Sequence, residues 1–146
     1  MSEIKQSIVI NAPVSKVFEF VTNPANWPRY VTNLMDVKDM SPDIPAKGST
    51  FTYQYKIMGF KVEGKGTVTE NVKDKSFGLS FESVVPIKES YDFVDRGNGT
   101  TEFFFNLQYE VPGQILAVAN KLLIEKLNTI EAKNVLEKIK AECEWS

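Results

Sequence analysis

The first third of the chain shows one strand pattern followed by two short helix patterns. Apolar and polar residues alternate from Glu3 to Asn11, as they do in a half-buried strand. From Val14 to Val21 apolar residues instead recur every three or four positions, which predicts a helix with one buried face. Asn23 and Pro24 end this helix, and Asn23 can cap a second one. The apolar positions of the second helix share a face and are Trp27, Tyr30, Val31 and Leu34.

From Met35 onward the apolar pattern mostly has a period of two, which predicts strands joined by hairpins. The breaks between the runs fall at Met58-Gly59, at Val85-Pro86 and at Gly97-Asn98-Gly99. An Asn-Gly pair is typical of a tight hairpin turn. Together with the first strand, these runs predict a curved antiparallel sheet of six or seven strands.

The last expected element is one helix from Gln114 to Glu144, about 45 Å long. Its apolar residues form two stripes. The first runs most of the length and comprises Val118, Leu122, Ala132, Leu136, Ile139 and Cys143. The second is confined to the first half and comprises Leu116, Ala119, Leu123, Leu127 and Ile130. A helix this long must lie across another layer, so we expect the first stripe to pack on the sheet and the second to overhang an unfilled space. The alternative is a wide core contact made by both stripes.

The predicted inner face of the sheet combines large aromatic residues with glycines that carry no side chain. Gly64 and Gly66 indicate a bulge or a cavity floor. Rings beside bare backbone are hard to pack solid, and tyrosine hydroxyls supply the few polar groups that ligand cavities use. The sequence therefore predicts a ligand cavity, and an aromatic core that fills itself is the alternative. The expected ligand-binding residues are Tyr30, Tyr53, Tyr55, Phe81, Glu89, Tyr91, Phe93, Phe105, Tyr109, Leu123 and Leu127.

Strict alternation places one charged residue, Glu89, on the inner face. A buried carboxyl group needs a partner, or else it takes up a proton. Lys126 on the long helix or a tyrosine hydroxyl can serve as that partner. The alternative is a strand that begins one residue later, or that carries a bulge, and leaves Glu89 in solvent.

The opening of the chain carries a resemblance to a known family. It reads I-x-I-N-A-P-x-x-x-V-F-x-F-V-T-N-P-x-N-W-P from Ile8 to Pro28. This wording resembles the START-like (SRPBCC, Bet v 1-like) superfamily of hydrophobic-ligand-binding proteins, nearest to its polyketide cyclase/dehydrase-like and CoxG-like branches. The resemblance extends over essentially the whole chain. It implies an α+β helix-grip fold, in which a curved antiparallel sheet wraps around a long C-terminal helix and two short helices follow the first strand.

Length and composition fit a single START-like domain over residues 1–146. A chain of 146 residues can bury about two thirds of its unfolded surface in one core. The net charge of -2 is spread without a basic block, which argues against nucleic acid or an anionic membrane as a partner. No signal-peptide pattern and no apolar run near the roughly 20 residues of a membrane span are found, so we expect a cytoplasmic protein. The pattern does not specify an oligomeric state.

The residues that most enzymes use for catalysis are scarce in this chain. It contains no histidine, and its single cysteine, Cys143, is interpreted as a packing residue. We therefore expect no metal, no cofactor and no catalytic residue. The resemblance implies binding or carriage of a hydrophobic small molecule, such as a lipid, a quinone or a polyketide-like compound, in a cavity between the sheet and the C-terminal helix. Two alternatives stay open: a metal-free cyclase/dehydratase-like enzyme, and an assembly factor or chaperone adaptor that acts on a protein partner.

Overall fold

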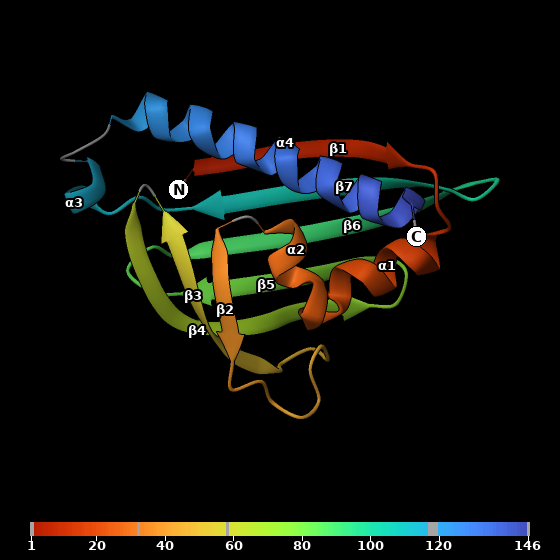
Figure 1. Ribbon diagram of the computed structural model, residues 1–146, viewed down its shortest axis with the longest axis horizontal. Coiled ribbons are helices and arrows are strands. Elements are labelled where there is room, and N and C mark those ends of the chain that lie inside the picture. The colour runs from red at the N-terminus through yellow and green to blue at the C-terminus, as the bar shows by residue number, and fades with distance from the viewer. Residues whose placement is uncertain (1, 32, 58, 117–119, 146) are drawn as a thin grey trace.

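The computed structural model describes residues 2–31, 33–57, 59–116 and 120–145, and within these residues seven strands form one antiparallel sheet (Figure 1). The strands are β1 (Ser2–Ile10), β2 (Leu34–Lys38), β3 (Thr50–Ile57), β4 (Phe60–Val72), β5 (Ser76–Glu82), β6 (Ile87–Gly97) and β7 (Thr100–Tyr109). They lie in the order β1-β7-β6-β5-β4-β3-β2. The predicted strand count is confirmed, and strands that follow one another from β2 to β7 pair as hairpins.

Helices cover one face of this sheet. After β1 come α1 (Val14–Thr22), a single 3-10 turn η1 (Pro24–Asn26) and α2 (Trp27–Tyr30), so the two short helices are confirmed, but the second ends at Tyr30 and Leu34, expected on its face, begins β2 instead. Because β1 and β2 lie at opposite edges, this segment has to cross the sheet. The C-terminal helix α4 (Lys121–Trp145) contacts β1, β7, α1 and α2, and Figure 1 shows it running obliquely across the sheet. The core lies between these helices and the inner face of the sheet.

The connection from α1 to α2 is held by hydrogen bonds to the last turn of α1. A helix leaves its final carbonyl groups without partners inside the helix. The indole Nε1 of Trp27 donates to the Val21 carbonyl at 3.0 Å, and the Tyr30 hydroxyl donates to the same oxygen at 2.8 Å. The side chain of Asn26 donates to the Phe20 carbonyl at 3.0 Å. These bonds allow Trp27 and Tyr30 to be fully buried although each carries a polar atom.

Gly64 and Gly66 of β4 make room for two aromatic rings. Gly64 lies opposite Tyr53 of β3, and a Cβ atom there would meet the backbone oxygen of Glu82 at 2.1 Å and the Tyr53 hydroxyl oxygen at 2.9 Å. Gly66 lies opposite Phe51, and a Cβ atom there would overlap the Phe51 ring. The register shift of this strand falls further along it. The prediction of a bulge is therefore wrong at both glycines, and that of a cavity floor is wrong at Gly66, where the Phe51 ring occupies the space, whereas Gly64 does line a pocket of about 370 Å³ between β2, β3 and β4.

The C-terminal segment forms two helices instead of the single helix expected from Gln114 to Glu144. A short helix, α3 (Gly113–Leu116), comes first, and α4 begins after Asn120. The Asn120 side chain accepts a hydrogen bond from the backbone N–H of Leu123 at 2.7 Å, which is the geometry of an N-cap. α4 has 25 residues and is therefore still about 37 Å long. The single-helix prediction fails because the apolar spacing continues past Asn120, whose side chain caps the start of α4.

α4 buries one face, and its first half leaves much of its apolar surface in solvent. The buried residues are Ile124, Ala132, Val135, Leu136, Ile139 and Cys143. The first predicted stripe is thus correct from Ala132 onward, but Leu122 is 79% exposed. The second stripe is half-exposed at Leu116, Leu123, Leu127 and Ile130. Val118 and Ala119 lie outside the described residues. A wide core contact made by both stripes is excluded at these exposed positions.

Candidate functional site

A cavity lies between the middle of α4 and the sheet, in the region where the sequence pattern predicts one. Its α4 wall consists of Asn128, Glu131, Ala132 and Val135. The opposite wall comes from the end of α2 and from β3, β6 and β7, and consists of Val31, Tyr55, Ile87, Glu89, Phe105, Leu107 and Tyr109. Apolar side chains therefore surround a small number of polar groups, as in most small-molecule sites.

The predicted ligand-binding residues divide into three groups in the structure. Those that line the cavity are Tyr55, Glu89, Phe105 and Tyr109. Those that are buried in the adjoining core are Tyr30, Tyr53, Phe81, Tyr91 and Phe93. Those that lie half-exposed on α4, outside the cavity wall, are Leu123 and Leu127. The inner aromatic residues mostly pack on one another: Tyr91 stacks on Phe105 with ring centroids 5.1 Å apart and an angle of 9° between the planes.

The cavity is small because these rings fill most of the space between helix and sheet. The region open to the centre of a water-sized sphere is about 30 Å³. One water molecule needs roughly 10–15 Å³ by this measure, whereas sites for drug-sized ligands are far larger. The alternative of an aromatic core that fills itself therefore describes most of the inner face. The cavity that is left has room for a small chemical group.

Glu89 points inward from β6 and is 8% exposed, as strict alternation predicts. Of the two partners expected for it, the tyrosine hydroxyl is the one observed: Tyr91 donates to Glu89 Oε2 at 2.5 Å. Lys126 is exposed on α4. Burial raises the pKa of Glu89 to about 7, and the hydrogen bond from Tyr91 opposes this rise. Near neutral pH the Glu89 carboxyl group can therefore both release and accept a proton.

The cavity wall is acidic. Burial is the main cause that raises the pKa of Tyr55 well above its usual range, and the charges of Glu89 and, more weakly, of Glu131 raise it further. The lining residues that the structure describes include these two carboxyl groups and neither lysine nor arginine. A negatively charged group that entered the cavity would thus lie beside two carboxyl groups and no neutralising cation.

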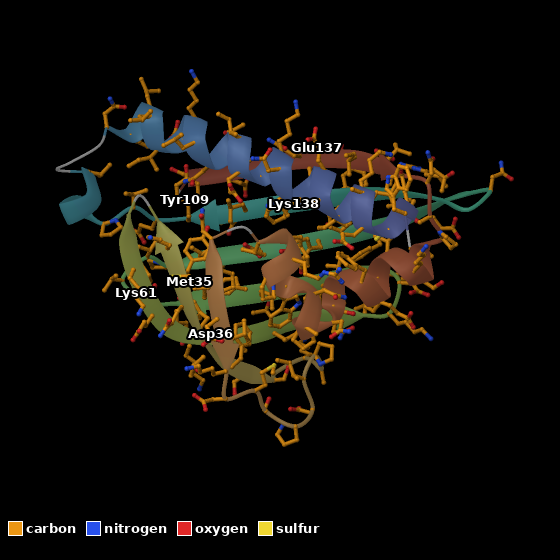
Figure 2. The ribbon with its side chains drawn as sticks, viewed as in Figure 1. Met35, Asp36, Lys61, Tyr109, Glu137 and Lys138 are labelled. Carbon is orange, nitrogen blue, oxygen red and sulfur yellow. The ribbon has the colours of Figure 1, made fainter. Side chains whose placement is uncertain are left out.

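Two polar atoms of the wall, the Tyr109 hydroxyl and Oε1 of Glu131, are buried and have no hydrogen-bond partner among the described residues. Figure 2 marks Tyr109 at the end of β7. The same side chain lines a second pocket of about 180 Å³, together with Ser2, Glu110, Val111, Leu116 and Lys121. Buried polar atoms are nearly always paired. Tyr109 and Glu131 thus each bring a buried polar atom without such a partner to the residues that line this cavity.

Metal binding and thiol chemistry have no evident place in the described residues. These residues contain no group of three or more His, Cys, Asp or Glu that could hold a metal ion. Cys143 is buried on α4, and burial raises the pKa of its thiol to about 11, which disfavours the reactive thiolate. Within the same part of the chain, no helix has both the length and the apolar character that crossing a membrane requires.

The α4 wall of the cavity is absent from the residues predicted as ligand-binding. Asn128 and Glu131 lie four and seven positions after the buried Ile124, on the helix face that also carries Ala132 and Val135. Polar residues within an otherwise buried stripe are the signal that marks this wall. Stripes defined by apolar residues alone do not reveal it.

Comparisons with known proteins identify the family and the fold. A family model described as polyketide cyclase / dehydrase and lipid transport matches residues 1–144. No curated protein matches the chain.

Several solved structures share the fold. TTHA0849 from Thermus thermophilus has a TM-score of 0.78 and 15% identity, over 96% of this chain and 95% of that chain. The Zhui aromatase/cyclase from Streptomyces sp. R1128 has a TM-score of 0.75 and 10% identity, over 98% and 93%. Ara h 8.0201 has a TM-score of 0.65 and 7% identity, over 97% of each chain. At such identities the likeness shows the helix-grip fold alone.

Proposed function

The chain belongs to the polyketide cyclase/dehydrase and lipid transport family, within the START-like superfamily, and on this premise we propose that it binds or carries a hydrophobic small molecule. The binding site is the cavity between α4 and the sheet. The observation that carries the proposal is the cavity wall, in which apolar side chains surround two buried polar atoms without partners among the described residues. This combination suits an apolar molecule that is held by one polar group.

The dimensions of the site determine how the molecule is held. The cavity of about 30 Å³ takes the polar head, and the rest of the molecule extends toward the neighbouring pocket of about 180 Å³, where Val111 and Leu116 offer apolar contacts beside the polar Ser2, Glu110 and Lys121. Tyr109 lines both spaces, at the end of β7. A lipid, a quinone or a polyketide-like compound has the elongated amphiphilic shape that this division requires.

Native mass spectrometry of protein purified without detergent tests the proposal directly. We expect a co-purified amphiphile, released on denaturation, and a thermal midpoint that rises when this compound is added back. The rise should be the same with and without a chelator. A compound that stays attached through denaturation would instead indicate a covalent enzyme intermediate.

A cavity-filling variant locates the site. Ala132→Leu places a larger side chain in the cavity wall and keeps a good helix former, so it should weaken binding of the amphiphile at least about tenfold. Leu127→Trp is the matched control, because it enlarges a half-exposed residue of the same helix outside the wall. Equal affinities for the parent and both variants would place the binding site elsewhere.

A second candidate function, cyclase/dehydratase-like catalysis, is favoured by Glu89. General acid-base catalysis is most effective when the pKa of the catalytic group lies near the working pH. The buried Glu89 carboxyl group, with its pKa near 7 and its hydrogen bond from Tyr91, has this property and lines the cavity. In this function, Glu89 moves a proton on a reactive chain that the cavity holds in shape.

Product analysis separates the two candidates. The protein is incubated with a linear poly-β-ketone thioester, and the products are resolved by mass spectrometry. Cyclised product that disappears in Glu89→Gln, while binding persists, would establish the enzyme. Binding without any turnover would favour carriage.

A further inference from the structure

The polar atoms of the cavity wall specify the chemistry of the ligand's head. Resting on the proposed function, that this cavity binds a hydrophobic molecule, we propose that the head of the molecule is a hydroxyl group, as in a phenol or an alcohol. Tyr109 and Glu131 hold it, one from the end of β7 and one from α4. The same wall also carries the Tyr55 hydroxyl, the Glu89 carboxyl group and the Asn128 amide.

The argument begins with the two unpaired atoms. The Tyr109 hydroxyl has a proton to donate, and Glu131 Oε1 is an acceptor. They do not bond to each other, yet they line one cavity with room for only a small group. A hydroxyl oxygen accepts one hydrogen bond and donates another through a single atom. It can therefore pair with a donor and with an acceptor at the same time.

Other heads leave one of these requirements unmet. A carboxylate or phosphate accepts hydrogen bonds only, so Glu131 Oε1 would remain without a donor, and the anion would lie beside the carboxyl groups of Glu89 and Glu131 with no lysine or arginine in the described wall. An ammonium group donates only, so the proton of the Tyr109 hydroxyl would remain without an acceptor. A purely apolar molecule would leave both wall atoms unpaired, which is costly in a buried site.

Four probes with the same hexylbenzene body and different heads test the assignment at neutral pH on the full chain. They are para-hexylphenol, para-hexylbenzoate, para-hexylbenzylammonium and hexylbenzene itself, and binding is measured by calorimetry. We expect the phenol to bind most tightly and the benzoate at least about tenfold more weakly, because burying an uncompensated charge is strongly unfavourable. Tightest binding of the benzoate or of the ammonium compound would overturn the inference.

Two tyrosine variants assign the contact. Tyr109→Phe removes the hydroxyl and keeps the ring, so the affinity for the phenol should fall about five- to tenfold while that for hexylbenzene stays within about twofold. Tyr53→Phe is the matched control, because it removes a buried hydroxyl from the core outside this cavity wall. An unchanged phenol affinity in Tyr109→Phe would mean that the wall atoms bind only water. The probe ranking on the parent protein needs no variant, so it stands even if a variant fails to fold.

The same measurements distinguish the failure of this inference from that of the proposed function. If none of the four probes binds or raises the thermal midpoint, the cavity is not a hydrophobic-ligand site and both fall. If hexylbenzene and the phenol bind equally well in the parent protein, the proposed function stands and the hydroxyl assignment is wrong.

Discussion

The buried Glu89 side chain should make the free energy of unfolding depend on pH. Folding raises its pKa from 4.5 to about 7, chiefly because burial disfavours the charged form. Between these two values the folded protein binds more protons than the unfolded chain. The free energy of unfolding therefore falls as the pH rises through this window. Below pH 4.5 the carboxyl group is neutral in both states and this contribution to the pH dependence vanishes.

Glu89→Gln should remove this pH dependence. The amide oxygen still accepts from Tyr91 but cannot ionise, so the variant should match the parent at about pH 4 and be more stable by up to about 3 kcal/mol at about pH 8. Urea unfolding followed by circular dichroism across this range measures the difference. Glu137→Gln, on the exposed side of α4, is the control and should follow the parent (Figure 2). A constant difference between Glu89→Gln and the parent would contradict the burial of an ionisable Glu89.

A substitution at Gly66 tests whether the Phe51 ring packs directly on the backbone of β4. Gly66→Ala adds a methyl group where the Phe51 ring lies, so it should lower the free energy of unfolding by about 1–3 kcal/mol. Gly113→Ala is the matched control, because a Cβ atom there meets nothing within 4 Å. Combining Gly66→Ala with Phe51→Leu should recover part of the loss. Equal stability of Gly66→Ala and the parent would mean that the ring can move away from β4.

At the scale of elements, the start of α4 depends on one side chain. Asn120→Ala removes the acceptor for the Leu123 N–H and should cost about 1 kcal/mol in the free energy of unfolding. Asn134→Ala, at an exposed position inside α4, should be neutral or slightly stabilising because alanine is the better helix former. Chemical denaturation of both variants provides the comparison. A loss as large in Asn134→Ala as in Asn120→Ala would refute the capping role.

The sequence pattern predicts the helices and strands better than it predicts where a helix begins or which element packs against it. The breaks between the strands from β3 to β7 agree with the pattern, because a strand with one buried and one exposed face alternates apolar and polar residues, whereas the pattern assigns Leu34 of β2 to a helix. The turn at Asn98-Gly99 has the two positive φ angles that this pair favours. The pattern misses the break at Asn120 because apolar spacing does not register a capping side chain. It places the half-exposed Leu127 at the cavity because periodicity fixes a helix face but not the element that covers it.

The candidate site is predicted in part for the same reason. Tyr55, Glu89, Phe105 and Tyr109 follow from alternation along single strands, and they do line the cavity. Its size depends instead on pairing between strands. Phe51 covers Gly66, and Tyr91 stacks on Phe105, so these rings fill space that composition alone leaves open. Such contacts depend on register across the sheet, which the pattern of one strand does not contain.

At the scale of the whole molecule, the packing argues for a single cooperative unit. The sheet is continuous from β1 to β2, and α4 contacts both the β1 edge and the helices α1 and α2 that cross toward the other edge. Trp27 lies at the centre of this arrangement, buried beside Phe51 and Phe77. Loss of α4 would therefore expose apolar surface along β1 and at both short helices, so α4 should not unfold separately from the sheet.

Trp145→Phe makes this expectation measurable. The chain has two tryptophans, and Trp145 is 90% exposed near the end of α4, so the variant should be about as stable as the parent and retain Trp27 as its one tryptophan. Trp27 fluorescence then reports the core, while far-ultraviolet circular dichroism is weighted toward the long helix α4. In a single cooperative domain the two signals change at the same urea concentration. An earlier loss of the helical signal would show that α4 detaches first, which would also give a ligand access to the cavity beneath it.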